Sequence, residues 1–270
     1  APDWFCLALL SAWLVLLASR SGVIRPALLW ILALVVGAVV GINAASDPLV
    51  TVSGLVPFAL ALLSGVALTP SPQARRTAWM GLATLVFVGA FWGATLAAMS
   101  ALNVSPEPGL HTAALADAPK VTSNLGLWLQ SIAVLSNGDF FGRSLTFTIG
   151  LSVACAGLGV AAVLLLPRVG WSALHRRPAE ARSDGALARA AFTTYWCSSA
   201  LLLSAAFVIS ATPVDIHADR YVVGLIYAAA AVMPVAATSR RYTRVLALSG
   251  TCVLALAGVI AMAQAVPARN

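Results

Sequence analysis

The sequence contains very little charge. Of its 270 residues only 9% are charged, whereas 60% are hydrophobic and the mean hydropathy is +0.93. Soluble domains carry roughly a quarter charged residues, so this composition excludes an ordinary soluble globular protein. Lysine is almost missing as well, because Lys120 is the only one, and the net charge of +7 therefore comes from arginine.

Cysteine and the common enzyme motifs are also scarce. The four cysteines lie inside apolar runs without CxxC or Cys/His spacing, which argues against a disulfide framework or a zinc site. No P-loop, GxGxxG, GxSxG or HExxH pattern occurs, and this excludes the nucleotide-binding and hydrolase classes that use them. We interpret the cysteines as small core residues.

What the sequence does contain is a series of long apolar runs. A helix needs about 20 residues to cross the hydrocarbon core with its backbone groups paired internally. We therefore predict an all-α, polytopic transmembrane helical bundle of about eight spans, forming a single domain over residues 1–270. The predicted spans are residues 4–19, 27–43, 49–68, 77–102, 145–166, 190–211, 222–237 and 245–266.

Two longer polar segments interrupt these runs. The first is an outer loop over residues 103–144, and the second is a cytoplasmic loop over residues 167–189. Inside the outer loop, residues 125–135 are apolar but too few to span, so they predict a short interfacial or re-entrant helix. Its apolar face is expected to hold Trp128, Ile132 and Leu135, with Gln130 and Ser131 on another face.

The basic residues follow the apolar runs in a pattern that indicates orientation. The turns after spans one, three, five and seven hold twelve of the 16 cationic residues, so we expect these turns to be cytoplasmic and expect no nucleic-acid partner. The twelve are Arg20, Arg25, Arg75, Arg76, Arg168, Arg176, Arg177, Arg182, Arg189, Arg240, Arg241 and Arg244.

Most of the acidic residues lie on the opposite side. Seven of the nine fall in the predicted outer segments, namely Asp3, Asp47, Glu107, Asp117, Asp139, Asp215 and Asp219. We therefore expect a multi-pass plasma-membrane protein with both termini of this chain on the outer side of the membrane. An outer N-terminus without a preceding charged signal region leads us to expect a fragment of a longer chain with further spans upstream.

The outer turns carry the candidate functional groups, because carboxylates at the mouth of a helical bundle are costly unless solvated, paired or used. Asp47 follows Asn43 and Ser46 at the end of the second span. One interpretation is a helix cap, since Ser46 or Asp47 before Pro48 fits the start of the next helix. The alternative is an active-site carboxylate.

Two further outer turns have comparable alternatives. Asp139 follows an Asn-Gly turn signal and stands four residues before Arg143, so it is either a capping residue or part of a phosphate-anchoring pair. Asp215, His217 and Asp219 alternate before Arg220. They form either a solvated loop or a metal or carboxylate–histidine site, and Arg220 predicts an anionic partner because it opposes the positive-inside bias.

The chain resembles the C-terminal part of bacterial GT-C superfamily glycosyltransferases. The residues that carry this resemblance are Asn43-Ala-Ala-Ser-Asp47-Pro, Asn137-Gly-Asp-Phe-Phe-Gly142 and Ala218-Asp-Arg220-Tyr221-Val-Val-Gly. They are short patterns spread over residues 40–240. The resemblance implies a polyprenyl-phosphate-linked sugar donor, inverting transfer at the outer face of the bacterial plasma membrane, and an acidic catalytic residue in an early external loop that is not identified in this sequence.

Within the chain, Asp47 is the expected general base, with Asp139 or Asp219 orienting the acceptor or pairing with arginine. Arg143 and Arg220 are expected to neutralise the leaving phosphate, assisted by Asn43, His217 and Tyr221 as substrate contacts. No cofactor is expected, with a divalent metal as the open alternative. The competing functions are a transporter or flippase-like permease and a non-catalytic membrane subunit.

Overall fold

The computed structural model describes the chain in several ranges. These are residues 2–20, 24–68, 71–104, 114–135, 185–211 and 222–237, with short pieces at 150, 153–154, 156–157, 159–161, 163–166, 168 and 252. Most residues in these ranges are helical and none of them forms a strand; one isolated antiparallel bridge joins Leu115 and Ser210. The all-α class is therefore confirmed for the described residues.

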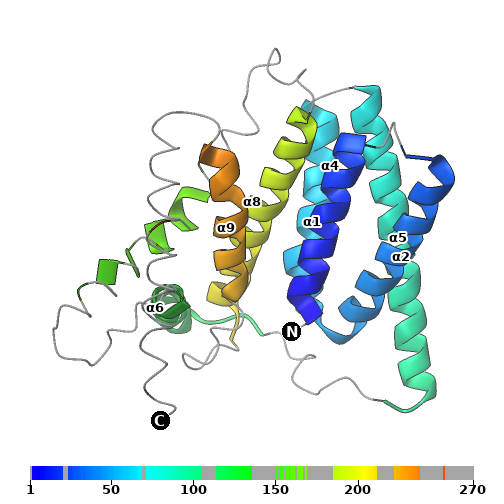
Figure 1. The fold of residues 1–270 in the computed structure, drawn as a ribbon. Helices are drawn as coiled ribbons and strands as arrows, with labels where there is room; N and C mark the ends of the chain where they lie inside the picture. The colour runs from blue at the N-terminus through cyan, green and yellow to red at the C-terminus, as the bar shows by residue number, and fades with distance from the viewer. Residues whose placement is uncertain are drawn as a thin grey trace, which may run out of the picture. The chain divides into compact units, whose positions relative to one another are not determined.

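The helices coincide with most of the predicted spans. They are α1 (Pro2–Arg20), α2 (Pro26–Ser46), α3 (Pro48–Val50), the π-helical turn η1 (Thr51–Leu55), α4 (Val56–Leu68), α5 (Pro72–Ala101), α6 (Ala118–Leu135), α8 (Ala186–Ile209) and α9 (Val223–Ala237) (Figure 1). By length and apolar composition, α2, α5 and α8 are sufficient to cross a membrane. The predicted span 245–266 lies outside the described residues except for Cys252, and span 145–166 is described only in pieces.

The chain divides into two compact units. Unit 1 comprises residues 1–113 and 170–202, and unit 2 comprises residues 114–169 and 203–270. α8 contributes its first turns to unit 1 and its last turns to unit 2. The prediction of one membrane domain over residues 1–270 stays a prediction.

Within unit 1, α1, α2, α4 and α5 lie side by side (Figure 1). α2 and α5 pack most closely because Gly37 and Gly41 have no side chain. A Cβ on Gly41 would stand 2.6 Å from the carbonyl oxygen of Val88 and 2.9 Å from Cβ of Phe91. Gly37 makes the same kind of close contact with Phe87. Residue numbers increase along both helices from the first contact to the second, so α2 and α5 run parallel. This is the small-xxx-small packing that helices in membranes favour.

α1 is held between α5 and α8 by buried hydrogen bonds. Towards α5, the Trp13 indole donates to Oγ1 of Thr84 at 2.9 Å. Towards α8, the Tyr195 hydroxyl donates to the carbonyl of Leu7 and the Trp196 indole donates to Oγ of Ser11, both at 3.0 Å. Each bond joins two helices in a largely apolar core, so these polar side chains specify which helix faces which.

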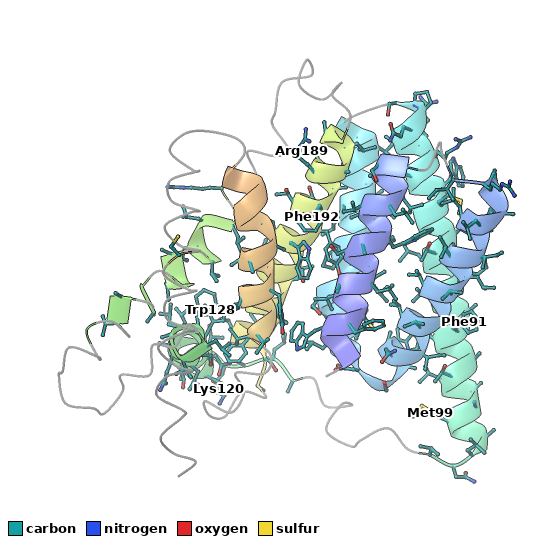
Figure 2. All side chains as sticks on the ribbon, viewed as in Figure 1. Phe91, Met99, Lys120, Trp128, Arg189 and Phe192 are labelled. Atoms are coloured by element: carbon teal, nitrogen blue, oxygen red, sulfur yellow. The ribbon has the colours of Figure 1, made fainter. Side chains whose placement is uncertain are left out.

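The arginine-bearing helix ends of unit 1 meet. Ala18, Ala74, Leu187 and Ala188 form one buried cluster, with Val15 packed against it. Ala18 precedes Arg20 by two positions, Ala74 directly precedes Arg75, and Ala188 directly precedes Arg189. The chain segments that follow the first and third predicted spans therefore converge with the end of the 167–189 loop. Arg189 and Met99 lie at opposite ends of this unit (Figure 2).

Unit 2 is built around α6, which is seen end-on in Figure 1 while α9 is seen along its length. α6 contacts α9. The segment before α6 is bonded to the end of α8, because the Ala116 N–H donates to the carbonyl of Ile209 and the Ala211 N–H donates to the carbonyl of Ala114. The helix starts seven residues earlier than the predicted 125–135 segment. Asp117 is the reason, because its Oδ1 accepts a hydrogen bond from the Lys120 N–H at 2.9 Å and caps the first turn.

Candidate functional site

The turn at the end of α2 is the predicted site that the structure describes most fully. Asp47 is half-buried and ends α2, and its N–H donates to the carbonyl of Asn43 at 2.9 Å. Its Oδ1 accepts a hydrogen bond from the Leu49 N–H at 2.8 Å. One residue therefore closes α2 and begins α3. The capping interpretation of Asp47 is confirmed, and Asp47 rather than Ser46 is the cap.

The cap occupies only one side of the carboxylate. Within the described part of the chain, Oδ2 of Asp47 has no hydrogen-bond partner and no basic group pairs with the carboxylate. The group lies at the end of an apolar 21-residue helix, which is about 31 Å long at 1.5 Å per residue. Arg25 stands at the other end of that helix, so Asp47 and Arg25 are about one hydrocarbon thickness apart.

The hydrogen bonds of Asn43 are made within α2 and to the residue that ends it. Its Nδ2 donates to the carbonyl of Val39 at 2.7 Å, and its carbonyl accepts from the Ser46 hydroxyl and the Asp47 N–H. One of the two amide N–H groups is therefore bonded within the helix, and the Asn43 side chain is held along α2. The structure brings Asn43 and Asp47 together, as adjacent turns of a helix require.

The other predicted site residues lie outside the described residues. These are Asp139, Arg143, His217, Asp219, Arg220 and Tyr221. Their convergence with Asp47 stays a prediction, as does the metal alternative at Asp215, His217 and Asp219. In the ranges that the structure describes, no group of three His, Cys, Asp or Glu side chains is placed to hold a metal ion.

A second polar site, which sequence reasoning missed, lies on α6. Asn124, Trp128 and Ser131 are buried on one face, and Asn124 Oδ1, Trp128 Nε1 and Ser131 Oγ have no hydrogen-bond partner among the described residues. Trp128 and Lys120 mark this helix in Figure 2. The expectation that Ser131 faces away from Trp128 and Ile132 was wrong, because residues three apart on an α-helix share a face.

The spacing of these residues is the signal that was available. Positions 124, 128 and 131 follow the i, i+4, i+7 pattern of one helix face. Because the predicted segment begins at residue 125, Asn124 lies in the predicted loop and the pattern is incomplete there.

Comparison with known proteins gives no relative. No protein-family model, curated protein or solved structure matches the chain.

Proposed function

We propose first that the chain is a multi-pass membrane protein with the arginine-bearing ends of unit 1 in the cytoplasm. Three helices have the length and composition to span, and apolar side chains are exposed along them, including Trp30, Ile31 and Val86. Lipid is the solvent that makes such exposure favourable. The eight-span topology, with the acidic turns outside, belongs to the same proposal.

We propose further that the protein is a GT-C type glycosyltransferase that uses a polyprenyl-phosphate-linked sugar at the outer face. The observation that supports this most is the state of Asp47. Its carboxylate is held by the Leu49 N–H, while its other oxygen is unpaired among the described residues. A general base needs this combination of a fixed orientation and a free lone pair.

The proposed reaction follows from these groups. Asp47 takes the proton from an acceptor hydroxyl, and that oxygen attacks the anomeric carbon of the donor sugar. The bond between the anomeric carbon and the phosphate oxygen breaks, and polyprenyl phosphate leaves with the electron pair. Arg143 and Arg220 neutralise the phosphate, with His217, Tyr221 and Asn43 as substrate contacts and Asp139 or Asp219 orienting the acceptor.

The test is transfer of labelled sugar from a polyprenyl-phosphate donor by purified protein in lipid nanodiscs. Asp47→Asn retains the capping oxygen but removes the base, so we expect transfer to fall by at least about a hundredfold. Asp117→Asn is the matched control, because Asp117 has the same capping role on α6. Arg220→Ala should also abolish transfer.

Three results would contradict the proposal. Full activity of Asp47→Asn would remove Asp47 from catalysis. If no lipid-linked sugar bound, the assignment to this class of glycosyltransferase would be wrong. Movement of the lipid-linked sugar between leaflets without a new glycosidic bond would support the flippase-like alternative instead.

A further inference from the structure

The unpaired polar atoms on α6 are concentrated in a small area. Among the described residues five buried side-chain polar atoms lack a partner, and three of them are on α6. Asn124 and Ser131 have no exposed surface, and Trp128 is 8% exposed. Buried polar groups are nearly always hydrogen-bonded in proteins. Three such atoms within two helical turns therefore indicate a ligand that supplies their partners.

The orientation of the Asn124 amide is determined by unit 2 itself. Its Nδ2 donates to the carbonyls of Val208 and Ser210, at 3.0 and 2.7 Å. Rotating the amide by 180° would place an oxygen against both carbonyls, so the assignment of nitrogen and oxygen is unambiguous. Oδ1 is consequently held as an acceptor that faces away from the α8 end.

The three atoms together define the chemistry of the ligand. Asn124 Oδ1 needs a donor, Trp128 Nε1 needs an acceptor, and the Ser131 hydroxyl takes either role. A hydroxyl group donates and accepts, whereas a phosphate or an ammonium group provides only one of these. From residue 124 to residue 131 the helix rises about 10 Å, which matches a headgroup with several hydroxyls rather than one water molecule.

The neighbouring surface of α6 adds the second part of the ligand. Leu125 and Leu129 follow Asn124 and Trp128 directly and are 47% and 41% exposed. An apolar stripe beside a polar face is typical of a helix that lies in the membrane interface. A lipid tail would cover these leucines while its headgroup bonds to the polar face.

We infer that α6 binds the neutral, hydroxyl-bearing headgroup of a glycosyl lipid through Asn124, Trp128 and Ser131. The binding site rests on α6 alone, and only its link to sugar transfer rests on the proposed function. Because the three atoms are already shielded from water, bonds to the ligand do not replace bonds to solvent.

The experiment measures lipid-dependent thermal stability in phosphatidylcholine nanodiscs that contain increasing fractions of glucosyl diacylglycerol. We expect saturable stabilisation by the glycolipid and none by an equal fraction of phosphatidic acid. Trp128→Phe keeps the ring but removes the N–H, and Ser131→Ala removes the hydroxyl. Each should weaken the response about tenfold, the effect of one hydrogen bond.

Ser123→Ala is the matched control, since Ser123 is exposed on the same helix. It should respond as the unmodified chain does. Equal responses of Trp128→Phe, Ser131→Ala and the unmodified chain would overturn the inference, as would a response to phosphatidic acid alone. Thermal stability that does not rise above the value in pure phosphatidylcholine at any glycolipid fraction would overturn it too. Glycolipid binding without sugar transfer would support the site on α6 and contradict the glycosyltransferase function, so the two proposals can fail separately.

Discussion

The hydroxyl of Ser199 on α8 donates a hydrogen bond of 2.6 Å to the backbone carbonyl of Ser53 in the π-helical turn η1. Pro57 explains why this carbonyl accepts from another helix. In an α-helix the N–H of residue 57 would bond to residue 53, and proline has no N–H. The chain instead widens into a π-turn, closed by the Val56 N–H on the carbonyl of Thr51.

This relationship predicts a specific loss of stability in Ser199→Ala. The variant leaves a buried carbonyl without its donor, and we expect the free energy of unfolding to fall by about 1–3 kcal/mol. Thermal and denaturant unfolding in detergent micelles measures the loss. Ser198→Ala is the control, because the Ser198 hydroxyl bonds only to carbonyls of its own helix, those of Thr194 and Tyr195.

The same relationship predicts that Pro57→Ala and Ser199→Ala are not additive. Alanine at position 57 supplies an N–H to Ser53, so the double variant should be less destabilised than the sum of the single variants by about 0.5 kcal/mol or more. Strict additivity would mean that Pro57 does not cause the interhelical bond.

The close packing of α2 on α5 predicts that Gly41→Ala destabilises the chain by about 1–3 kcal/mol. The new Cβ would stand 2.6 Å from a backbone oxygen, which has no side-chain freedom to move away. Gly93→Ala is the comparison, because a Cβ there meets nothing within 4 Å, and alanine is the better helix former by about 1 kcal/mol. Similar unfolding temperatures for the two variants would contradict the packing.

The cap at the end of α2 predicts different stability for two substitutions of Asp47. Asp47→Ala removes the acceptor for the Leu49 N–H and should lower the free energy of unfolding by about 0.5–2 kcal/mol. Asp47→Asn retains an acceptor oxygen and should be close to the unmodified chain. Equal destabilisation by both would show that the negative charge, and not the hydrogen bond, stabilises the turn.

The proposed orientation predicts opposite accessibility for two exposed positions on α5. Arg76 and Ser100 are both exposed, and 24 residues of helix separate them by about 36 Å. In a chain without other cysteines, an impermeant maleimide added to intact cells should label Ser100→Cys. It should label Arg76→Cys only after permeabilisation. Labelling of both from outside would show that α5 does not cross the membrane.

Much of the helical structure was predictable because its cause is local. An apolar run needs internal backbone pairing in lipid, and this requires only the composition of each segment. The predicted 27–43 and 77–102 runs therefore agree with α2 and α5 to within five residues. The start of α6 was missed because the preceding stretch is polar, although Asp117 and Pro119 are residues that favour a helix start.

The candidate sites were predictable to different degrees. Asp47 as a cap followed from its position before Pro48, because capping involves neighbours in sequence. The polar face of α6 did not follow, since an unpaired Trp128 or Ser131 is recognised only when its surroundings are known. Trp13 and Trp196 lie in apolar runs that indicate no polar partner, yet each donates a buried hydrogen bond to another helix.

By itself, the sequence determined the helical class, the positions of most helices and the separation of arginine from most acidic residues. Each of these depends on short segments and on the solvent that they require. Only the tertiary structure decided that Ser199 meets Ser53, 146 positions away, that α2 and α5 run parallel in contact at Gly41, and that three arginine-bearing ends converge. Such pairings depend on the rotation and register of each helix against its neighbours, which no local pattern specifies.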